Sequence, residues 1–318
     1  LGLAHSVNPA QSAIAHPRYY AHAAVHDDLG VITPWYRGLN GPCDFRVHIA
    51  AETLKRYPWT TTNDAVAVYP YYLFTSLWQI APNGAITPKN PGEWMNGDLG
   101  QRATSLLNGW VDYYRYSGDP AAIAHLNYLG DFLLDHCVTP PDHPWPGLFI
   151  SVPVKGKPYG KCDPRGIIQL DICGSTGQGL LRAYQVTGQG RWFEAAKHWG
   201  DLLADRCNLE PTADPWPRYA NPEAAPWKDN KQTGGVTMLL GFLDELIRLG
   251  HTGKDNRIVA ARDAGRRYLR DKLLPAWAVN DTWGRYFGDW ANPVQNCLTT
   301  PDAAQFSANH HVVVARRD

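Results

Sequence analysis

Apolar residues recur every three to four positions over three pairs of segments in the middle of the chain, which is the spacing of one face of an α-helix. Within each pair, a tight turn at Gly118, Gly188 or Gly253 separates the two segments. The predicted helix pairs are 98–117 with 120–137, 171–187 with 191–207, and 233–249 with 255–274. Each pair is therefore predicted to form an antiparallel helical hairpin with a short turn at one end.

A tryptophan turn closes each copy of this pattern, with Trp145, Trp216 and Trp283 at corresponding positions. The turn glycines are 70 and 65 residues apart, and the tryptophans are 71 and 67 apart. A fixed period of this kind marks a repeated supersecondary unit, and stacked helical hairpins curl into a solenoid or close into a toroid. We predict an all-α fold, an (α/α)-toroid of repeated helical hairpins. Because six hairpins need more chain than this, we expect an incomplete toroid or a fragment.

The region before the hairpins shows weaker periodicity. Residues 1–44 are rich in His, Pro and Gly and are predicted to be an irregular lead-in to a hairpin domain over 45–318. The elements predicted before the first hairpin are a helix over 45–57, a helix over 63–80 broken at Pro70, and a loop over 82–96. The boundaries follow from the prolines and glycines, which interrupt helices and favour turns.

Composition and charge narrow the range of functions. Lys plus Arg equals Asp plus Glu at 30 each, so the overall charge does not favour nucleic acid or an anionic membrane as a partner. No stretch approaches the ~20 apolar residues that span a bilayer. Residues 1–15 lack the basic start and apolar core of a signal peptide. A mature secreted chain would look the same, so the sequence leaves the location open and slightly favours a secreted or periplasmic protein over a cytoplasmic one.

Metal and cofactor signatures are weak. The 6 cysteines contain no Cys-x-x-Cys pair, which argues against structural zinc, and most are expected to be buried thiols. His22 and His26 have the i, i+4 spacing of helical metal ligands, but no third ligand is evident. No glycine-rich phosphate loop and no Gly-x-Ser-x-Gly elbow is present. We therefore predict neither a metal nor a cofactor.

Aromatic residues gather in the long loops, which all lie at the end of the hairpins opposite the glycine turns. The chain has 13 Trp and 16 Tyr but only 8 Phe, and aromatic rings with a polar group suit stacking on sugars, although packing between helices is the alternative. Loops on one face of a rigid scaffold commonly carry function. The tryptophans expected to line a sugar cleft are Trp94, Trp145, Trp216 and Trp283.

Two aspartates are candidates for catalysis at this loop end. Asp98 and Asp171 each open a predicted helix and are 73 residues apart, about one repeat. Adjacent hairpins would therefore place them across one cleft. Cleavage of a glycosidic bond commonly uses such a pair, one as acid and one as base or nucleophile. The alternative for each is a simple helix cap, because Asp is a favoured N-cap residue.

Three short stretches carry a family resemblance. They are GIIQLDICGS (166–175), GLLRAYQVTG (179–188) and WFEAAKHW (192–199). Together they resemble the second-hairpin region of six-hairpin glycosidases, most closely the unsaturated glucuronyl hydrolases. The position of Asp171 matches a catalytic aspartate of that family. The resemblance implies an (α/α)-toroid and acid-assisted cleavage of an acidic sugar.

Basic side chains in the loops fit an acidic substrate, because arginine can hold a carboxylate through two parallel hydrogen bonds. The alternative is solvated loop charge. The residues concerned are Lys155, Lys157, Lys161, Arg165, Arg218 and Arg285, with Tyr159 among the lysines. Of these, Tyr159, Arg165 and Arg218 are predicted to contact the substrate.

We therefore expect an enzyme that cleaves uronic-acid-containing oligo- or polysaccharides, a glycoside hydrolase of the unsaturated-uronyl type with Asp171 and Asp98 as its catalytic pair. A polysaccharide lyase is the first alternative, since a Tyr or His can abstract the proton next to a uronate carboxylate. Its candidates are Tyr159, Tyr219, His143 and Tyr286. A glycan-binding protein without catalysis is the second alternative.

Overall fold

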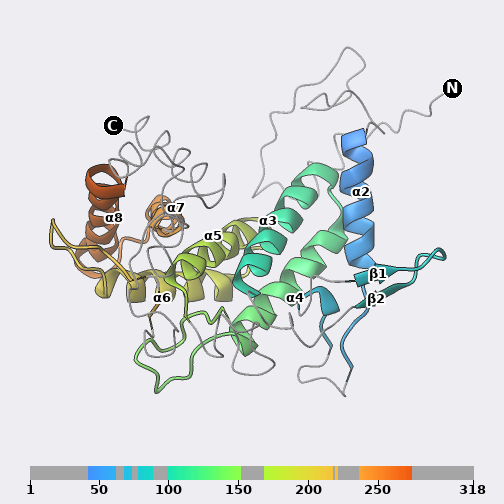
Figure 1. Ribbon diagram of the computed structural model, residues 1–318, viewed down its shortest axis with the longest axis horizontal. Helices are drawn as coiled ribbons and strands as arrows, with labels where there is room; N and C mark the ends of the chain where they lie inside the picture. The colour runs from blue at the N-terminus through green and yellow to red at the C-terminus, as the bar shows by residue number, and fades with distance from the viewer. Residues whose placement is uncertain are drawn as a thin grey trace, which may run out of the picture.

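The computed structural model shows a mostly helical protein whose hairpins follow one another in an arc (Figure 1). The residues that it describes are 42–61, 68–73, 78–88, 99–151, 168–217, 219–220 and 236–273. From one end of the arc to the other, α2 is followed by α3 and α4, then α5 and α6, then α7 and α8.

Three helical hairpins build this arc, as the sequence predicts. They are α3 (Leu99–Ser117) with α4 (Pro120–His136), α5 (Leu170–Thr187) with α6 (Gly190–Asp205), and α7 (Val236–Arg248) with α8 (Arg257–Tyr268). A 3-10 turn (Lys254–Asn256) precedes α8 and a π-helical turn (Leu269–Leu273) follows it. If these turns are counted with α8, the predicted and observed helix ends agree within three residues.

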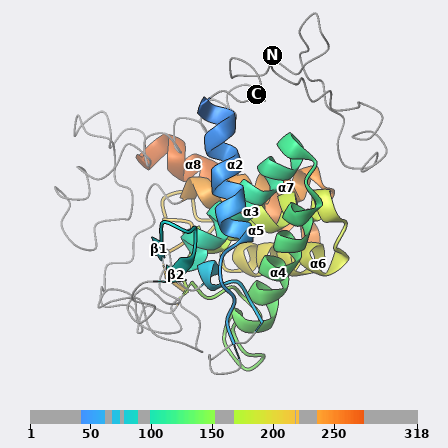
Figure 2. The ribbon, with the colours of Figure 1, turned by 90° about the vertical axis from the view of Figure 1, so that its right-hand side faces the viewer.

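The hairpins form two layers. Helices α3, α5 and α7 pack side by side as an inner layer, and α4, α6 and α8 cover it from outside. Figure 2 shows α3 and α5 lying one behind the other with α4 and α6 on one side. Because consecutive hairpins repeat the same up-and-down course, the inner helices run parallel. The fold is therefore an incomplete (α/α)-toroid over the described residues, and the beginnings of the inner helices share the end of the arc that carries the long loops.

The short turns explain why the hairpins fold back so tightly. Gly118 and Gly188 have φ angles of 68° and 76°, in the left-handed region that glycine enters without a steric cost. Asp119 follows the first turn as the N-cap of α4, where its side chain accepts a hydrogen bond from the Ala121 backbone N–H at 2.9 Å. Pro120 then occupies the first helical position, which is favourable for proline.

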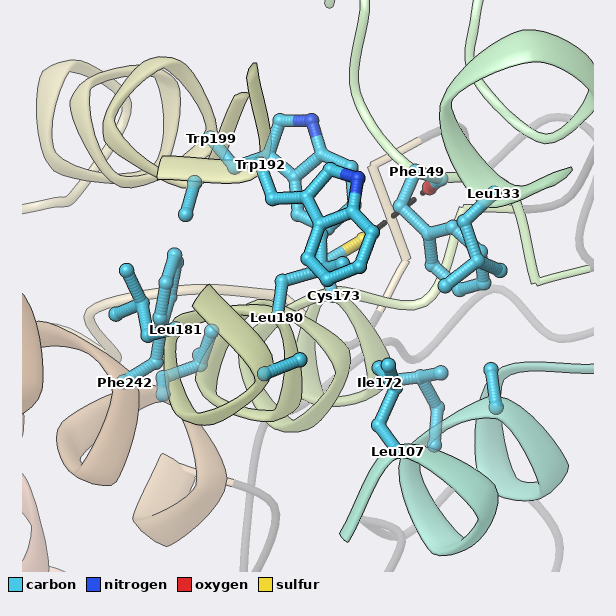
Figure 3. Packing of buried hydrophobic residues seen from close by; sticks show 14 of the residues in the cluster. Leu107, Leu133, Phe149, Ile172, Cys173, Leu180, Leu181, Trp192, Trp199 and Phe242 are labelled. Atoms are coloured by element: carbon cyan, nitrogen blue, oxygen red, sulfur yellow. Dashed lines mark hydrogen bonds between the residues drawn. The ribbon is translucent and has the colours of Figure 1, made fainter. Parts of the chain in front are cut away.

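Tryptophan side chains fill much of the space between the layers. Figure 3 shows Trp192 and Trp199 of α6 pointing toward Cys173 and Leu180 of α5. The Trp199 Nε1–H also donates to the carbonyl of Gly147 at 2.8 Å. The loop that closes the first hairpin is therefore fastened to the outer helix of the second, so each hairpin supports the next.

The segments before α3 differ from the prediction. Helix α2 (Pro42–Lys55) begins three residues before the predicted helix and also before the predicted domain boundary. The helix predicted over 63–80 is wrong where the structure describes it, because Tyr71–Leu73 is a 3-10 turn and Trp78–Ile80 is a strand, β1.

A small hairpin explains this correction. Strand β1 pairs antiparallel with β2 (Ile86–Pro88), so the predicted loop over 82–96 is also wrong in part. The turn between the strands contains Asn83 and Gly84, and Gly84 has a φ angle of 81°. An Asn-Gly pair between two apolar runs is a strong hairpin signal, and it outweighs the apolar spacing that suggested a helix.

A histidine of α4 is buried against Trp110 of α3 and Tyr72. His125 is 7% exposed, its ring stacks on Trp110 at 4.5 Å, and its Nδ1 lies 2.6 Å from the Tyr72 hydroxyl. Burial raises the pKa of Tyr72, so that hydroxyl keeps its proton and can donate a hydrogen bond to Nδ1 of the neutral imidazole. Loss of hydration lowers the pKa of His125 to about 4.

This histidine makes the stability of the protein depend on pH. The unfolded state binds a proton near the ordinary His pKa of about 6.5, whereas the folded state resists protonation down to about 4. We expect the free energy of unfolding to fall between these pH values, with His125 contributing up to about 3 kcal/mol of the loss. Urea denaturation at a series of pH values measures this.

The matched variant is His125→Gln, which can still accept a hydrogen bond from Tyr72 but does not titrate. Other groups contribute to acid sensitivity equally in both proteins, so the difference between the two pH profiles isolates His125. The profile of the variant is expected to be flatter below pH 6.5. Parallel profiles would show that His125 is protonated in the folded state as easily as in the unfolded chain.

Candidate active site

Asp171 lies at the loop end of the central inner helix. Helix α5 begins at Leu170 with Gln169 as its N-cap, so Asp171 is the second helical residue rather than the cap itself. Its side chain is 1% exposed, and its Oδ1 accepts a hydrogen bond from the Ile172 backbone N–H at 2.9 Å. A carboxylate in the first turn also interacts favourably with the positive end of the helix dipole.

Two chain segments converge on the start of α5. Gln169 forms an isolated antiparallel bridge with Tyr219, and the Ala220 N–H donates to the Ile168 carbonyl at 3.0 Å. On the other side, the Cys173 thiol donates to the Phe149 carbonyl at 3.2 Å, the dashed line in Figure 3. The segments after α4 and after α6 are thereby held against the first turn of α5.

We call this convergence the α5 head and define it by five buried side chains: Ser151, Gln169, Asp171, Cys173 and Tyr219. Four of these carry oxygen-containing polar groups, although the surrounding positions are mostly apolar. The sequence had indicated Asp171 and, as a base candidate, Tyr219. It did not point to Ser151 or Gln169, and the only local signal was a glutamine inside the apolar run Gly-Ile-Ile-Gln-Leu.

The thiol in the α5 head is not a nucleophile. Burial raises the pKa of Cys173 well above its ordinary value, and the nearby charge of Asp171 raises it further. A protonated, buried thiol is unreactive. Cys137, Cys173 and Cys207 are all buried and free, which confirms the expectation of buried thiols for the cysteines whose side chains are described. Any catalytic chemistry at the α5 head must therefore use its oxygen-containing side chains.

Farther along α5, a polar stripe ties the inner helices together. The Ser175 hydroxyl lies 3.1 Å from that of Thr104 in α3, and Arg182 forms an ion pair at 2.5 Å with Asp112 of the same helix. Toward α7, the Gln185 amide donates to Glu245 at 2.7 Å. These groups satisfy one another, so the stripe has a structural role and the α5 head remains the candidate site.

Two of the predicted sugar-binding tryptophans have a different role. Trp216 is 1% exposed, and its Nε1–H donates to the Leu203 carbonyl at 2.8 Å. Trp145 is 9% exposed, with the guanidinium of Arg206 4.5 Å from its ring centre. Both rings are thus packed in the protein interior, which is the alternative that the sequence left open, and a contact with sugar stays a prediction for both. The turn that contains Trp145 fastens the first hairpin to the second, because Arg206 at the end of α6 packs on its ring.

The other predicted site residues fall outside the described residues and stay predictions. They are Asp98, Trp94, Tyr159, Arg165, Arg218 and Trp283. The same holds for His22 and His26. Within the described part of the chain, no group of three or more His, Cys, Asp or Glu side chains could hold a metal ion. None of the described helices is long and apolar enough to cross a membrane.

Comparisons with known proteins identify no family for this chain. No protein-family profile matches the chain, and no curated protein is significantly similar to it. A cellobiose 2-epimerase from Spirochaeta thermophila DSM 6192 is similar in structure, with 14% identity and a TM-score of 0.43, over 60% of this chain and 46% of that one. A polysaccharide lyase matches with 14% identity and a TM-score of 0.49, over 69% of this chain and 62% of that one. The chain thus spans about half to three-fifths of these proteins, and similarity at this level assigns neither family nor activity.

Proposed function

We propose that this protein is a carbohydrate-active enzyme that cleaves glycosidic bonds at the α5 head, with Asp171 as its general acid/base. The observation that carries the proposal is the position of Asp171. Its carboxyl group is buried in the first turn of the central inner helix, where the segments that follow two outer helices converge. A carboxyl group held in place at this position can exchange a proton with a glycosidic oxygen or with the attacking water.

The finer proposal is a glycoside hydrolase of the unsaturated-uronyl type. Hydrolysis needs a second group that activates water or attacks the sugar, and Asp98 is the proposed partner because it precedes α3 as Asp171 begins α5. Support for an acidic sugar comes from the family resemblance around Asp171 and from the basic residues of the loops. Arg165 and Arg218 are the proposed contacts for the uronate carboxylate.

A polysaccharide lyase is the second candidate, and the position of Tyr219 favours it. Tyr219 was proposed from the sequence as a base, and its bridge to Gln169 brings it to the α5 head with Asp171. In β-elimination the base removes the proton next to the uronate carboxylate and the bond to the leaving oxygen breaks. A double bond forms in the sugar, and an acid returns a proton to the leaving oxygen.

Product analysis separates these functions. The wild-type protein is incubated with uronic-acid polysaccharides and with their unsaturated oligosaccharides, and reducing ends and ultraviolet absorbance are followed together. Loss of the absorbance of unsaturated sugars supports the unsaturated-uronyl hydrolase. New reducing ends together with rising absorbance identify a lyase, and new reducing ends without an absorbance change identify another hydrolase. If no glycan of the panel changes, the proposed enzyme function fails and a glycan-binding protein becomes the better hypothesis.

A further inference from the structure

Two polar atoms in the α5 head are buried without a hydrogen-bond partner. They are Oε1 of Gln169 and Oγ of Ser151, on side chains that are 3% and 0% exposed. Buried polar groups in proteins nearly always have a partner, and an unsatisfied one destabilises the folded state. Two such atoms at one end of one helix therefore call for an explanation.

The fold itself does not use the Gln169 side chain. Gln169 is the N-cap of α5, yet its side chain makes no capping hydrogen bond, in contrast to Asp119 at the start of α4. Its backbone carbonyl accepts from the Cys173 N–H at 2.9 Å, and next to it the Ile168 carbonyl accepts from the Ala220 N–H across the bridge to Tyr219. The backbone around Gln169 is thus held in place, while the side-chain amide oxygen is buried without a partner among the described residues.

Ser151 reaches the same end of α5 from the preceding hairpin. The Ile150 N–H donates to the Cys137 carbonyl at 2.8 Å, and Phe149 accepts the Cys173 thiol hydrogen. The first bond ties this segment to the end of α4, and the second holds it against the first turn of α5. Ser151 and Gln169 therefore lie at the same buried end of α5 as Asp171, the proposed acid.

We propose that Ser151 and Gln169 form a subsite that binds hydroxyl groups of the sugar next to Asp171. An amide oxygen accepts hydrogen bonds, so the ligand must provide a donor, which a sugar hydroxyl does. A uronate carboxylate is only an acceptor and cannot satisfy that oxygen. The acidic group of the substrate consequently binds elsewhere, toward the basic loops. This inference rests on the proposed function and adds the part of the substrate that the α5 head recognises.

If this subsite exists, a single substitution in it should weaken substrate binding without lowering the stability of the protein. Gln169→Met keeps the length of the side chain and removes the unsatisfied amide, so the free energy of unfolding is expected to stay the same or rise. The kcat/KM for the glycan that the wild type cleaves best is expected to fall about tenfold or more, through KM, because a substrate hydroxyl loses its partner. Ser151→Ala is the smaller second variant and is expected to act in the same direction.

The matched control is Gln178→Met on the same helix, where the amide donates to the Gly241 carbonyl at 3.4 Å. Stability is expected to fall slightly and KM to stay unchanged in this control. If Gln169→Met loses stability and keeps its KM, the amide is structural and the subsite is wrong. If the wild type cleaves no glycan, the proposed function itself fails and the subsite with it; cleavage with an unchanged KM in both head variants refutes the subsite alone.

Discussion

Replacing Asp171 with asparagine is expected to lower kcat/KM for glycan cleavage about 10³-fold, within the range that general acid catalysis contributes. Asparagine has nearly the same size, and its oxygen can still accept the Ile172 N–H that Asp171 holds at 2.9 Å. The start of α5 should therefore keep its structure. What the variant loses is the ability to give up and regain a proton. Initial rates on the best substrate, with thermal unfolding of both proteins, measure the two effects separately.

Asp119→Asn is the matched control for this experiment. Asp119 also stands at the start of a helix, but at the short-turn end of the arc, where it caps α4 and pairs with Lys55 at 2.5 Å. Asparagine is an equally good N-cap residue, so a small change in stability and wild-type activity are expected. An equal loss of activity in both variants would indicate a general structural effect. Full activity of Asp171→Asn, with a rise in ultraviolet absorbance, would instead favour a lyase with Tyr219 as its base.

The helical hairpins could be predicted from the sequence because their determinants are local. Gly118 and Gly188 provide left-handed turns, and the apolar spacing on either side identifies the helices that they join. The period of the pattern then indicates the stacking of hairpins into layers. Asp171 could be singled out for the same reason, since the start of an inner helix is recognisable from the turn pattern and the loop before it.

The features that escaped prediction depend on contacts between distant segments. The sequence shows that the tryptophan turns recur, but it does not show what the rings contact. The ring of Trp145 packs under Arg206 from the next hairpin, a contact between segments far apart in the chain. The amide of Gln169 is buried only because the chain around Tyr219 returns to pair with it. Neither contact leaves a periodic signal in the sequence. The strand at Trp78–Ile80 was missed for another reason, which is that a short apolar run is compatible with a helix and with a strand.

Gly174→Ala is expected to destabilise the protein by about 2 kcal/mol, although alanine is the better helix former. Gly174 lies in α5 directly against the backbone of α7. A methyl group there would lie 2.9 Å from the Leu239 Cα and 3.0 Å from the Leu239 backbone nitrogen. These are backbone atoms of α7, so the contact cannot be relieved by a side-chain rotation. The helices have to move apart, and the packing between them is lost.

Gly109→Ala supplies the matched control, because it makes the same chemical change in a neighbouring inner helix. Gly109 is exposed in α3, and a methyl group there would meet no atom within 4 Å. The helix propensity of alanine then acts alone, and the free energy of unfolding is expected to rise by about 0.5–1 kcal/mol. Urea denaturation of the two variants should therefore give shifts of opposite sign.

The consequence for function follows from the position of Gly174, less than one helical turn beyond Asp171. Separation of α5 from α7 displaces the α5 head relative to the loops that complete the site, so Gly174→Ala should also lower kcat, while Gly109→Ala should not. Catalytic geometry is sensitive to shifts of about 1 Å. Equal stabilisation by both alanines would show that α5 and α7 are farther apart than the structure places them. A destabilised Gly174→Ala with full activity would place the reacting groups away from the α5 head.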